Sequence, residues 1–391
     1  MTNLPIRFWR AVLNRLIRAI YFSPSILLSC LKVRFVVINH PDRIGHLCLE
    51  PDCFIKEGEL GARPYYRGII LIPKESAANQ ELLALWSQRI TVISSNLWCS
   101  LLRPFLRFPR MRYETHQYAV AIGSTAQCAK IYAEWGRRAP LLALSDSDKI
   151  RGLDRLEQLG VPKDAWYVCI HSRDGGFSPN DEHLHSFRNS NIEHYIPAMQ
   201  AIVKRGGWCI RVGEETSRLL SPLENVIDYA HSPLKSDWMD VYLCASCLFF
   251  LGNSSGLFLL STVFGKHTAS ANMVPVSNAL PLGFDDLGIP KLLRHHGQLM
   301  AYSQILNSPI ANFRFASQYK EHEILVEENS PEEIRDLAIE MLDRSQGTAK
   351  YGDLDEELQR KFQNLIRPGH YSFGANSRVG RDFLRQYSSL I

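Results

Sequence analysis

The sequence predicts an α/β protein with two Rossmann-like domains that face a cleft, preceded by an amphipathic helix. Three observations lead to this fold class. The chain has 391 residues, too many for one ordinary core and enough for two domains. Short apolar runs alternate with helical segments, which is typical of parallel strands covered by helices on both faces. That alternation stops in a polar stretch near residue 150 and then starts again.

The composition is that of a folded chain with a basic beginning. Hydrophobic residues make up 46% and charged residues 21% of the sequence, as in globular proteins. The chain has 44 Lys and Arg against 40 Asp and Glu, yet six of the basic residues precede residue 35 and the first carboxylate is Asp42. The remainder, with 38 basic and 40 acidic groups, has a net charge of −2. Because nucleic-acid binding needs a basic face on the folded part, we expect no nucleic-acid partner.

The first 32 residues form a segment of their own. Apolar side chains recur at helical spacing in residues 4–22, with arginines between them. The apolar set is Ile6, Trp9, Leu13, Leu16, Ile17 and Ile20, and the basic set is Arg7, Arg10, Arg15 and Arg18. This pattern predicts a helix lying on an anionic membrane surface, with a helix packed on its own domain as the alternative. The longest charge-free run, residues 19–31, is too short to span a bilayer and contains Pro24.

An N-terminal domain is predicted over residues 33–160. Buried-strand runs occupy residues 33–39, 68–73 and 90–94, and a helix begins at residues 81–87. Polar residues 145–165 form a helix that ends near Gly160 and Pro162, where we place the domain boundary. Asp146 and Asp148 match the D-x-D of metal-dependent glycosyltransferases, but their place at a helix start favours capping.

A C-terminal domain is predicted over residues 161–350, followed by a segment at 351–391. Its strands occupy residues 166–171, 208–212 and 247–251, and its helices residues 197–204, 237–245 and 254–264. The nine cysteines are scattered, several within apolar runs, which indicates core packing in a reducing compartment. Cys244 and Cys247 lack a second pair with ligand spacing, so core packing is favoured over a metal site.

Three strands of the second domain end in polar residues. His171 and Arg173 follow the first, Arg211 and Gly213 end the second, and Ser254 follows the third. Ligands of open parallel sheets bind at the carboxyl ends of strands, and arginine suits phosphate oxygens. A helix beginning at Ser254 would add backbone N–H donors for an anion. The predicted diphosphate-binding set is His171, Arg173, Arg188, Arg211, Gly213, Ser232, Lys235, Ser236, Asp240, Ser254, Ser255 and Gly256.

Two other functions fit parts of this pattern. Residues 252–256 also match G-x-S-x-G, the nucleophile turn of α/β-hydrolases, which would make Ser254 a nucleophile. Its acid would be Asp285 or Asp286 and its base His295, His296 or His322. That interpretation leaves Arg173, Arg211 and Lys235 without a role. A non-catalytic nucleotide- or sugar-binding protein on the same scaffold is the other alternative.

Several long motifs resemble a bacterial family of GT-B glycosyltransferases associated with surface polysaccharide gene clusters. They are residues 188–214 (RNSNIEHYIPAMQAIVKRGGWCIRVGE), 232–256 (SPLKSDWMDVYLCASCLFFLGNSSG) and 328–342 (ENSPEEIRDLAIEML). The Arg43-Ile-Gly-His46-Leu block and the block from Ser377 resemble it too, so the likeness covers nearly the whole chain. His171-x-Arg173 is also similar to a motif of GDP-fucose-dependent fucosyltransferases, but Asp-Gly-Gly follows here instead of a second arginine.

The resemblance implies a GT-B enzyme whose C-terminal domain binds a nucleotide sugar and whose N-terminal domain binds a lipid-linked or polysaccharide acceptor. It implies no metal cofactor, because protein cations stabilise the departing diphosphate. Glu50, Asp52 and His46 are the candidate bases for the acceptor hydroxyl. The last residues, 376–390, would form a helix that crosses back to the N-terminal domain. The family's role in lipopolysaccharide-type synthesis implies a cytoplasmic protein, peripheral on the inner face of the membrane.

Overall fold

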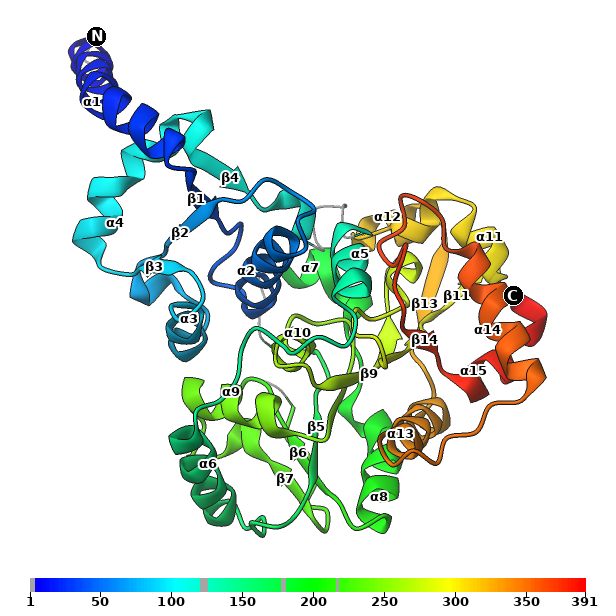
Figure 1. Ribbon diagram of the computed structural model, residues 1–391. Coiled ribbons are helices and arrows are strands. Elements are labelled where there is room, and N and C mark those ends of the chain that lie inside the picture. The colour runs from blue at the N-terminus through cyan, green and yellow to red at the C-terminus, as the bar shows by residue number, and fades with distance from the viewer. Residues whose placement is uncertain (1–3, 120–125, 177–180, 216–217) are drawn as a thin grey trace. The chain divides into compact units, whose positions relative to one another are not determined.

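A computed structural model describes residues 4–119, 126–176, 181–215 and 218–391, which group into two compact units (Figure 1). The N-terminal unit is Met1–His116 and the C-terminal unit is Gln117–Ile391. The sequence placed the boundary at residue 160 instead. Residues 117–160 group with the second unit because helix α6 (Asp146–Gln158) packs on α9 (Asp237–Ser246). A Cβ at Gly152 would lie 1.8 Å from the ring of Tyr242, so this packing needs a glycine.

The N-terminal unit contains a four-stranded parallel sheet with the order β3-β2-β1-β4. Its strands are β1 (Val33–Val37), β2 (Arg67–Leu71), β3 (Thr91–Ile93) and β4 (Arg112–Glu114). Its helices after α1 are α2 (Ile44–Glu59), α3 (Gln80–Trp86) and α4 (Asn96–Leu102). The three predicted strands are present. The sequence missed β4 because its three residues, Arg-Tyr-Glu, carry no apolar run.

Helix α1 (Leu4–Cys30) is longer than the helix predicted over residues 4–22 and continues through Pro24. Its second half packs on a small core of the N-terminal unit, where Tyr21 and Leu28 contact the cluster around Phe35 and Phe105. The rings of Tyr21 and Phe105 meet edge to face at 4.8 Å. No helix in the described part of the chain has the length and hydrophobicity needed to cross a membrane.

The C-terminal unit is built on a seven-stranded parallel sheet with the order β14-β10-β9-β8-β5-β6-β7. The strands are β5 (Tyr167–Ile170), β6 (Trp208–Arg211), β7 (Val226–Asp228), β8 (Phe249–Gly252), β9 (His267–Met273), β10 (Leu287–Pro290) and β14 (Arg378–Val379). A small antiparallel sheet adds β12 (Gln298–Leu299), β11 (Leu292–His295) and β13 (Ile324–Glu327). The α/β class with parallel sheets is therefore confirmed.

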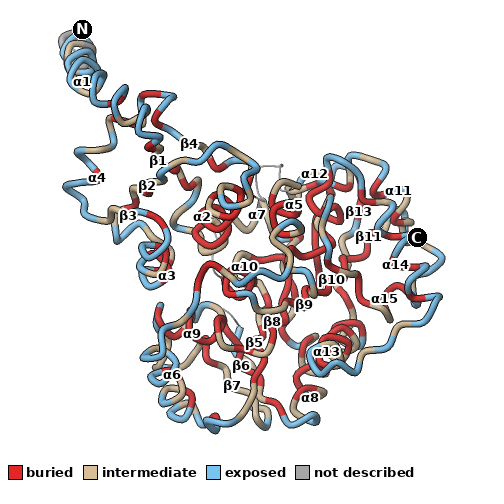
Figure 2. Tube along the Cα trace, viewed as in Figure 1, coloured by how far each residue is buried: buried red, intermediate tan, exposed pale blue. Residues whose placement is uncertain are grey.

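Helices surround this sheet, and Figure 2 shows buried residues at its centre, along β5, β8 and β9. They are α5 (Ala126–Trp135), α6, α7 (Glu182–His185), α8 (Ile196–Lys204), α9, α10 (Phe258–Val263), α11 (Tyr302–Leu306), α12 (Ala316–Glu321), α13 (Pro331–Ser345), α14 (Asp353–Leu365) and α15 (Arg381–Gln386). Every residue of β5 and β8 is buried, as expected for strands covered on both faces. All nine cysteines are free and eight are buried, which agrees with their predicted use in core packing.

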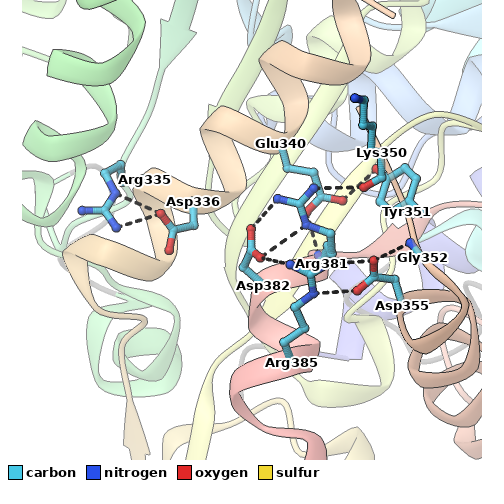
Figure 3. Close-up of polar contacts among 10 residues, drawn as sticks. All are labelled: Arg335, Asp336, Glu340, Lys350, Tyr351, Gly352, Asp355, Arg381, Asp382 and Arg385. Atoms are coloured by element: carbon cyan, nitrogen blue, oxygen red, sulfur yellow. Dashed lines mark hydrogen bonds and ion pairs between the residues drawn. The ribbon is translucent and has the colours of Figure 1, made fainter. Parts of the chain in front are cut away.

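The C-terminal segment packs on α13 of its own unit (Figure 3). Buried Glu340 on α13 accepts hydrogen bonds from the backbone N of Arg381 at 2.6 Å and from Tyr351 Oη at 2.8 Å. Arg385 forms a bidentate pair with Asp355 at 2.6 and 2.8 Å, which joins α15 to α14. The predicted helix at residues 376–390 is the shorter α15, which polar contacts hold to the C-terminal unit. The crossing of this segment to the N-terminal domain stays a prediction.

Candidate functional site

The C-terminal unit has its topological switch point between β5 and β8. From β5 the chain adds β6 and β7 on one side, and β8, β9 and β10 follow on the other. Ligands of such sheets bind outside the carboxyl ends of the strands at this point. His171 and Arg173 follow β5, and Asn253 and Ser254 follow β8, so both predicted strand ends meet there.

Asn253 joins these two strand ends. Its side chain is fully buried, its Oδ1 accepts from the backbone N of Arg173 at 3.0 Å, and its Nδ2 donates to the carbonyl of Arg188 at 3.0 Å. Arg188 in turn donates from Nε to the carbonyl of Ser254 at 2.9 Å. The sequence analysis did not name Asn253, although its place directly after a buried strand could have indicated it.

Arg173 is the predicted cation that the structure places most clearly at this edge. Its Nη1 donates to Asn189 Oδ1 and lies 3.7 Å from Glu182 Oε2, while its side chain keeps 11% of its surface exposed. These contacts orient a planar donor group suited to bidentate binding of phosphate oxygens.

Lys291 is a second cation here, and the sequence analysis missed it. It follows β10, is 2% exposed and donates from Nζ to the carbonyl of Asn189 at 2.5 Å. The pKa of its ammonium is lowered to about 8, chiefly by burial and to a lesser extent by the charge of Arg173, against the opposing charge of Glu328. A buried, desolvated cation of this kind is stabilised by an anion placed beside it. Lys291 could not be recognised in the sequence because a single Lys after Leu-Gly-Ile-Pro resembles an ordinary strand end.

His171 supplies a hydrogen-bonding group and no charge at neutral pH. Burial lowers the pKa of its imidazole to about 4. Its Nδ1 lies 3.1 Å from the carbonyl of Val212, which can only accept, so Nδ1 carries the proton and Nε2 the lone pair. Gly213, at φ +149°, sits beside this ring, and a Cβ there would lie 3.4 Å from Nδ1.

Other predicted donor-site residues have structural contacts. Arg211 is 1% exposed and pairs with Asp228 at 3.0 Å, an arrangement that joins the last residues of the neighbouring strands β6 and β7. Lys235 pairs with Asp240 at 3.1 Å and lies 3.9 Å from Glu214. Burial raises the pKa of Asp240 to about 6. The hydroxyls cap turns: Ser236 Oγ accepts from Met239 N at 3.2 Å, and Ser232 Oγ accepts from Leu234 N at 3.2 Å.

The turn after β8 differs from the prediction. Helix α10 begins at Phe258 and has six residues, so the expected helix start at Ser254 is wrong and supplies no anion site at the serines. The chain turns within residues 253–256, where Ser255 N donates to the carbonyl of Asn253 at 2.6 Å. Ser255 Oγ accepts from Leu257 N at 3.3 Å, and Gly256 is half-buried beside it.

The same geometry speaks against the hydrolase alternative. Ser254 is 6% exposed and its Oγ donates to the carbonyl of Val274 at 2.8 Å. The proposed acids and bases have other settings. The carboxylate of buried Asp286 accepts hydrogen bonds from Thr268, and Asp285 forms ion pairs with Arg137 and Arg344. Among the bases, His322 lies 2.9 Å from the carbonyl of Gln318. His295 and His296 lie on an exposed hairpin.

The N-terminal unit has its own switch point, between β1 and β4. The chain adds β2 and β3 on one side of β1, and β4 on the other. Four polar side chains gather at the carboxyl ends of these two strands. Glu50 on α2 is fully buried and accepts from Asn39 N and Nδ2 at 3.0 Å each, and from Thr115 Oγ1. His46 Nδ1 lies 2.6 Å from Glu50 Oε1.

This arrangement separates the three predicted bases. Glu50 has no exposed surface and contacts His46, whose side chain is 13% exposed, so His46 is the member of the pair that is open to solvent. With Nδ1–H donating to the carboxylate, Nε2 carries the lone pair. Asp52 lies inside α2, fully buried and paired with Lys56 at 2.7 Å, which is a core ion pair.

Two further features lie away from the strand ends. Among the described residues, one group of side chains could hold a metal ion. It consists of His295, His296 and Glu323, which are all exposed and whose ligand atoms lie within 4.8 Å of one another. A cavity of about 920 Å³ beside α13 and α14 is lined by paired side chains such as Arg344 with Asp285 and Arg378 with Glu356. Asp146 and Asp148 begin α6, where Ser145 Oγ accepts from Asp148 N, so the capping interpretation holds.

The chain matches no known protein-family model and no curated protein. Three of the solved structures to which it is similar each match 61% of this chain. They are ADP-heptose lipopolysaccharide heptosyltransferase II of E. coli (12% identity, 84% of that chain, TM-score 0.35), a family 9 glycosyl transferase from Veillonella parvula (8%, 79%, 0.36) and the dodecameric iron-containing heptosyltransferase TibC in complex with ADP-D-β-D-heptose (13%, 57%, 0.36). At such low TM-scores the function has to be argued from the site itself.

Proposed function

We propose that the protein is a GT-B glycosyltransferase that moves a sugar from a nucleotide-sugar donor to a lipid-linked or polysaccharide acceptor in bacterial surface glycan synthesis. One observation supports this most: each unit carries a polar cluster at its switch point, and the two clusters differ in chemistry. Arg173 and Lys291 offer positive charge, whereas His46 and Glu50 offer a base. A group transfer to a hydroxyl needs both.

In the proposed reaction, Arg173 and Lys291 bind the donor diphosphate and stabilise the charge that develops as the bond from sugar to phosphate breaks. His46 Nε2 takes the proton of the acceptor hydroxyl, whose oxygen forms the new bond to the anomeric carbon. Glu50 holds the imidazole in the required tautomer and stabilises its charged form. The protein cations supply the charge, so we propose that the enzyme needs no metal ion.

The proposal is tested by a thermal-shift screen with UDP, GDP, CDP and ADP. At least one nucleotide is expected to raise the melting temperature by several degrees at about 100 times its Kd, since ligand binding adds about 2.7 kcal/mol there. Failure of all four to shift it would overturn the donor site. Transfer assays that run equally well in EDTA would support metal independence.

The two alternatives give different results. Labelling of Ser254 by a fluorophosphonate, with no nucleotide effect on melting, would support the hydrolase. Tight donor binding without hydrolysis or transfer to any glycan or lipid acceptor would support a non-catalytic binding protein. We propose that the enzyme works in the cytoplasm, with α1 holding it at the inner face of the membrane.

A further inference from the structure

We propose that the N-terminal unit contacts an anionic lipid bilayer through two separate elements, α1 and α4, and not through α1 alone. The inference extends the membrane attachment proposed above. It does not depend on the transfer reaction, because lipid binding can be measured without donor or acceptor.

The first element is an uncovered apolar stripe on α1. Trp9, Leu16, Ile20 and Leu27 are 56–68% exposed and follow one another at intervals of seven, four and seven residues. At 3.6 residues per turn these positions fall on one face of the helix, over a length of about 27 Å. Tyr21, which points to the core of the unit, lies on a different face. The stripe is thus free to enter a lipid interface while the helix stays attached to its unit.

The second element is α4, which the sequence analysis did not connect with a membrane. Leu97, Trp98 and Leu101 are 45–66% exposed, and their spacing of i, i+1 and i+4 places them on one face of the helix. Cys99 is buried and points the other way. Tryptophan is enriched at membrane interfaces, where its ring meets both lipid and water. Among the described residues, these three large apolar side chains are not members of the core cluster around Phe35 and Phe105.

The charge around both elements matches an anionic surface. Residues 1–41 and 82–113, which contain α1, α4 and the turns that follow α4, carry eleven basic residues and no carboxylate. Exposed Arg15 and Arg18 lie on α1, and exposed Arg103, Arg107 and Arg110 follow α4. Each Lys or Arg close to an anionic leaflet adds electrostatic attraction. Apolar and basic groups together are what an interfacial element needs.

Direct contacts hold the two elements together. Tyr21 Oη donates to the carbonyl of Leu101 at 2.7 Å, and Arg107 Nη1 donates to Asn14 Oδ1 at 2.9 Å. The turns Arg103–Arg107 and Pro109–Met111 pack on α1, and Phe108 contacts Phe22 at 6.4 Å between ring centroids. Because both elements belong to one unit and share these contacts, they can engage one surface at the same time.

A second copy of the chain fits this surface less well. Two copies meeting through α1 would bring the same arginines together, and α1 has no acid to pair with them. Ser23 and Pro24 also interrupt the apolar repeat, and a helix pair would leave α4 uncovered. The bilayer accounts for both elements and for their charge.

The test is co-sedimentation of the full-length protein with phosphatidylglycerol–phosphatidylethanolamine vesicles and with phosphatidylcholine vesicles. The variants are Leu16→Ser/Ile20→Ser in α1 and Leu97→Ser/Trp98→Ser in α4. The control is Leu325→Ser/Leu354→Ser, which removes two equally exposed leucines from the C-terminal unit. We expect each test variant to bind anionic vesicles about tenfold more weakly, since about 1.4 kcal/mol is lost. The control should bind like wild type, and phosphatidylcholine should bind wild type poorly.

Unchanged binding by the α4 variant, with loss in the α1 variant, would overturn the two-element surface. Equal binding to both kinds of vesicle would overturn the charge argument. Light scattering tests whether a second copy of the chain covers this surface. If wild type is a dimer that does not bind vesicles, and both variants are monomers, the proposal is also overturned. Melting temperature and its nucleotide shift should stay unchanged in all variants, which separates this surface from the donor site.

Discussion

The two units share a design and differ in charge. Each has a parallel sheet whose strand order reverses beside its first strand, and each gathers polar side chains at the carboxyl ends next to that point. In the N-terminal unit the cluster is a buried carboxylate that holds a histidine. In the C-terminal unit it is a pair of cations beside a neutral histidine. The same kind of scaffold thus presents either a carboxylate–histidine pair or a pair of cations, depending on which residues follow its strands.

The surfaces differ as well. The N-terminal unit carries 16 Lys and Arg against 8 Asp and Glu, whereas the C-terminal unit carries 28 against 32. The basic excess therefore extends beyond α1 through the whole N-terminal unit, and the C-terminal unit is acidic overall. The proposed binding of a diphosphate to a net negative unit requires local cations, which is why single residues such as Arg173 matter.

The largest effect is expected from the base in the N-terminal unit. His46→Ala should lower kcat by about 10²–10⁴-fold, because general base catalysis is lost. Nucleotide binding, measured by thermal shift, should not change. His40→Ala is the matched control, since this exposed ring lies 5.1 Å from His46 and lacks the Glu50 contact. Glu50→Gln should give an intermediate loss. Full activity in His46→Ala would contradict the proposed role of His46 as the general base.

Next is a stability effect that separates structural from ligand-binding arginines. Arg211→Met should lower the free energy of unfolding by about 3–5 kcal/mol, because the buried Arg211–Asp228 pair loses one partner. Denaturant titration measures this. Arg205→Met, which breaks the exposed pair with Asp343, should cost about 0–1 kcal/mol. If Arg211→Met is as stable as wild type but binds nucleotide weakly, the sequence-based role of Arg211 is right.

A smaller effect is expected at the donor site. Arg173→Ala should weaken nucleotide binding about ten- to hundredfold, as for the loss of a charge-assisted hydrogen bond, with the melting temperature of the free protein nearly kept. Isothermal titration measures the affinity. Arg294→Ala, which removes an arginine paired with Glu327 outside the site, is the control. Equal affinity in wild type and Arg173→Ala would contradict the assignment of this strand end.

The smallest effect is a pH dependence. Lys291, with its pKa lowered to about 8 by burial, is charged below that pH and neutral above it. An adjacent diphosphate favours the charged form, so nucleotide affinity should fall as pH rises through 8, by at most about tenfold per pH unit. Lys291→Met should bind more weakly at pH 7 and lose this dependence. A wild-type affinity that stays constant from pH 7 to 9.5 would exclude Lys291 from the site.

Much of the fold could be predicted because buried parallel strands are continuous apolar runs. The strands at residues 33–39, 166–171 and 208–212 could be recognised in this way. Strand β4 and the start of α10 could not, since three residues of Arg-Tyr-Glu and a turn of Asn-Ser-Ser-Gly have no distinctive period. The grouping of α6 with the C-terminal unit could not be predicted for a related reason: α6 is polar on most of its surface, and the glycine that lets it pack on Tyr242 looks ordinary in the sequence.

The sequence by itself determined the α/β class, the strand ends at which the polar residues gather, the basic N-terminus and the core use of the cysteines. Those properties depend on local pattern and composition. Only the tertiary structure decided which polar residues are buried in pairs and which remain at a reachable edge. Arg173 and Arg211 are alike in the sequence, each at a strand end, yet one lies at the switch point and the other is 1% exposed beside Asp228. The physical reason is that burial and pairing are set by neighbours distant in the chain, as Asn253, Lys291 and Thr115 show.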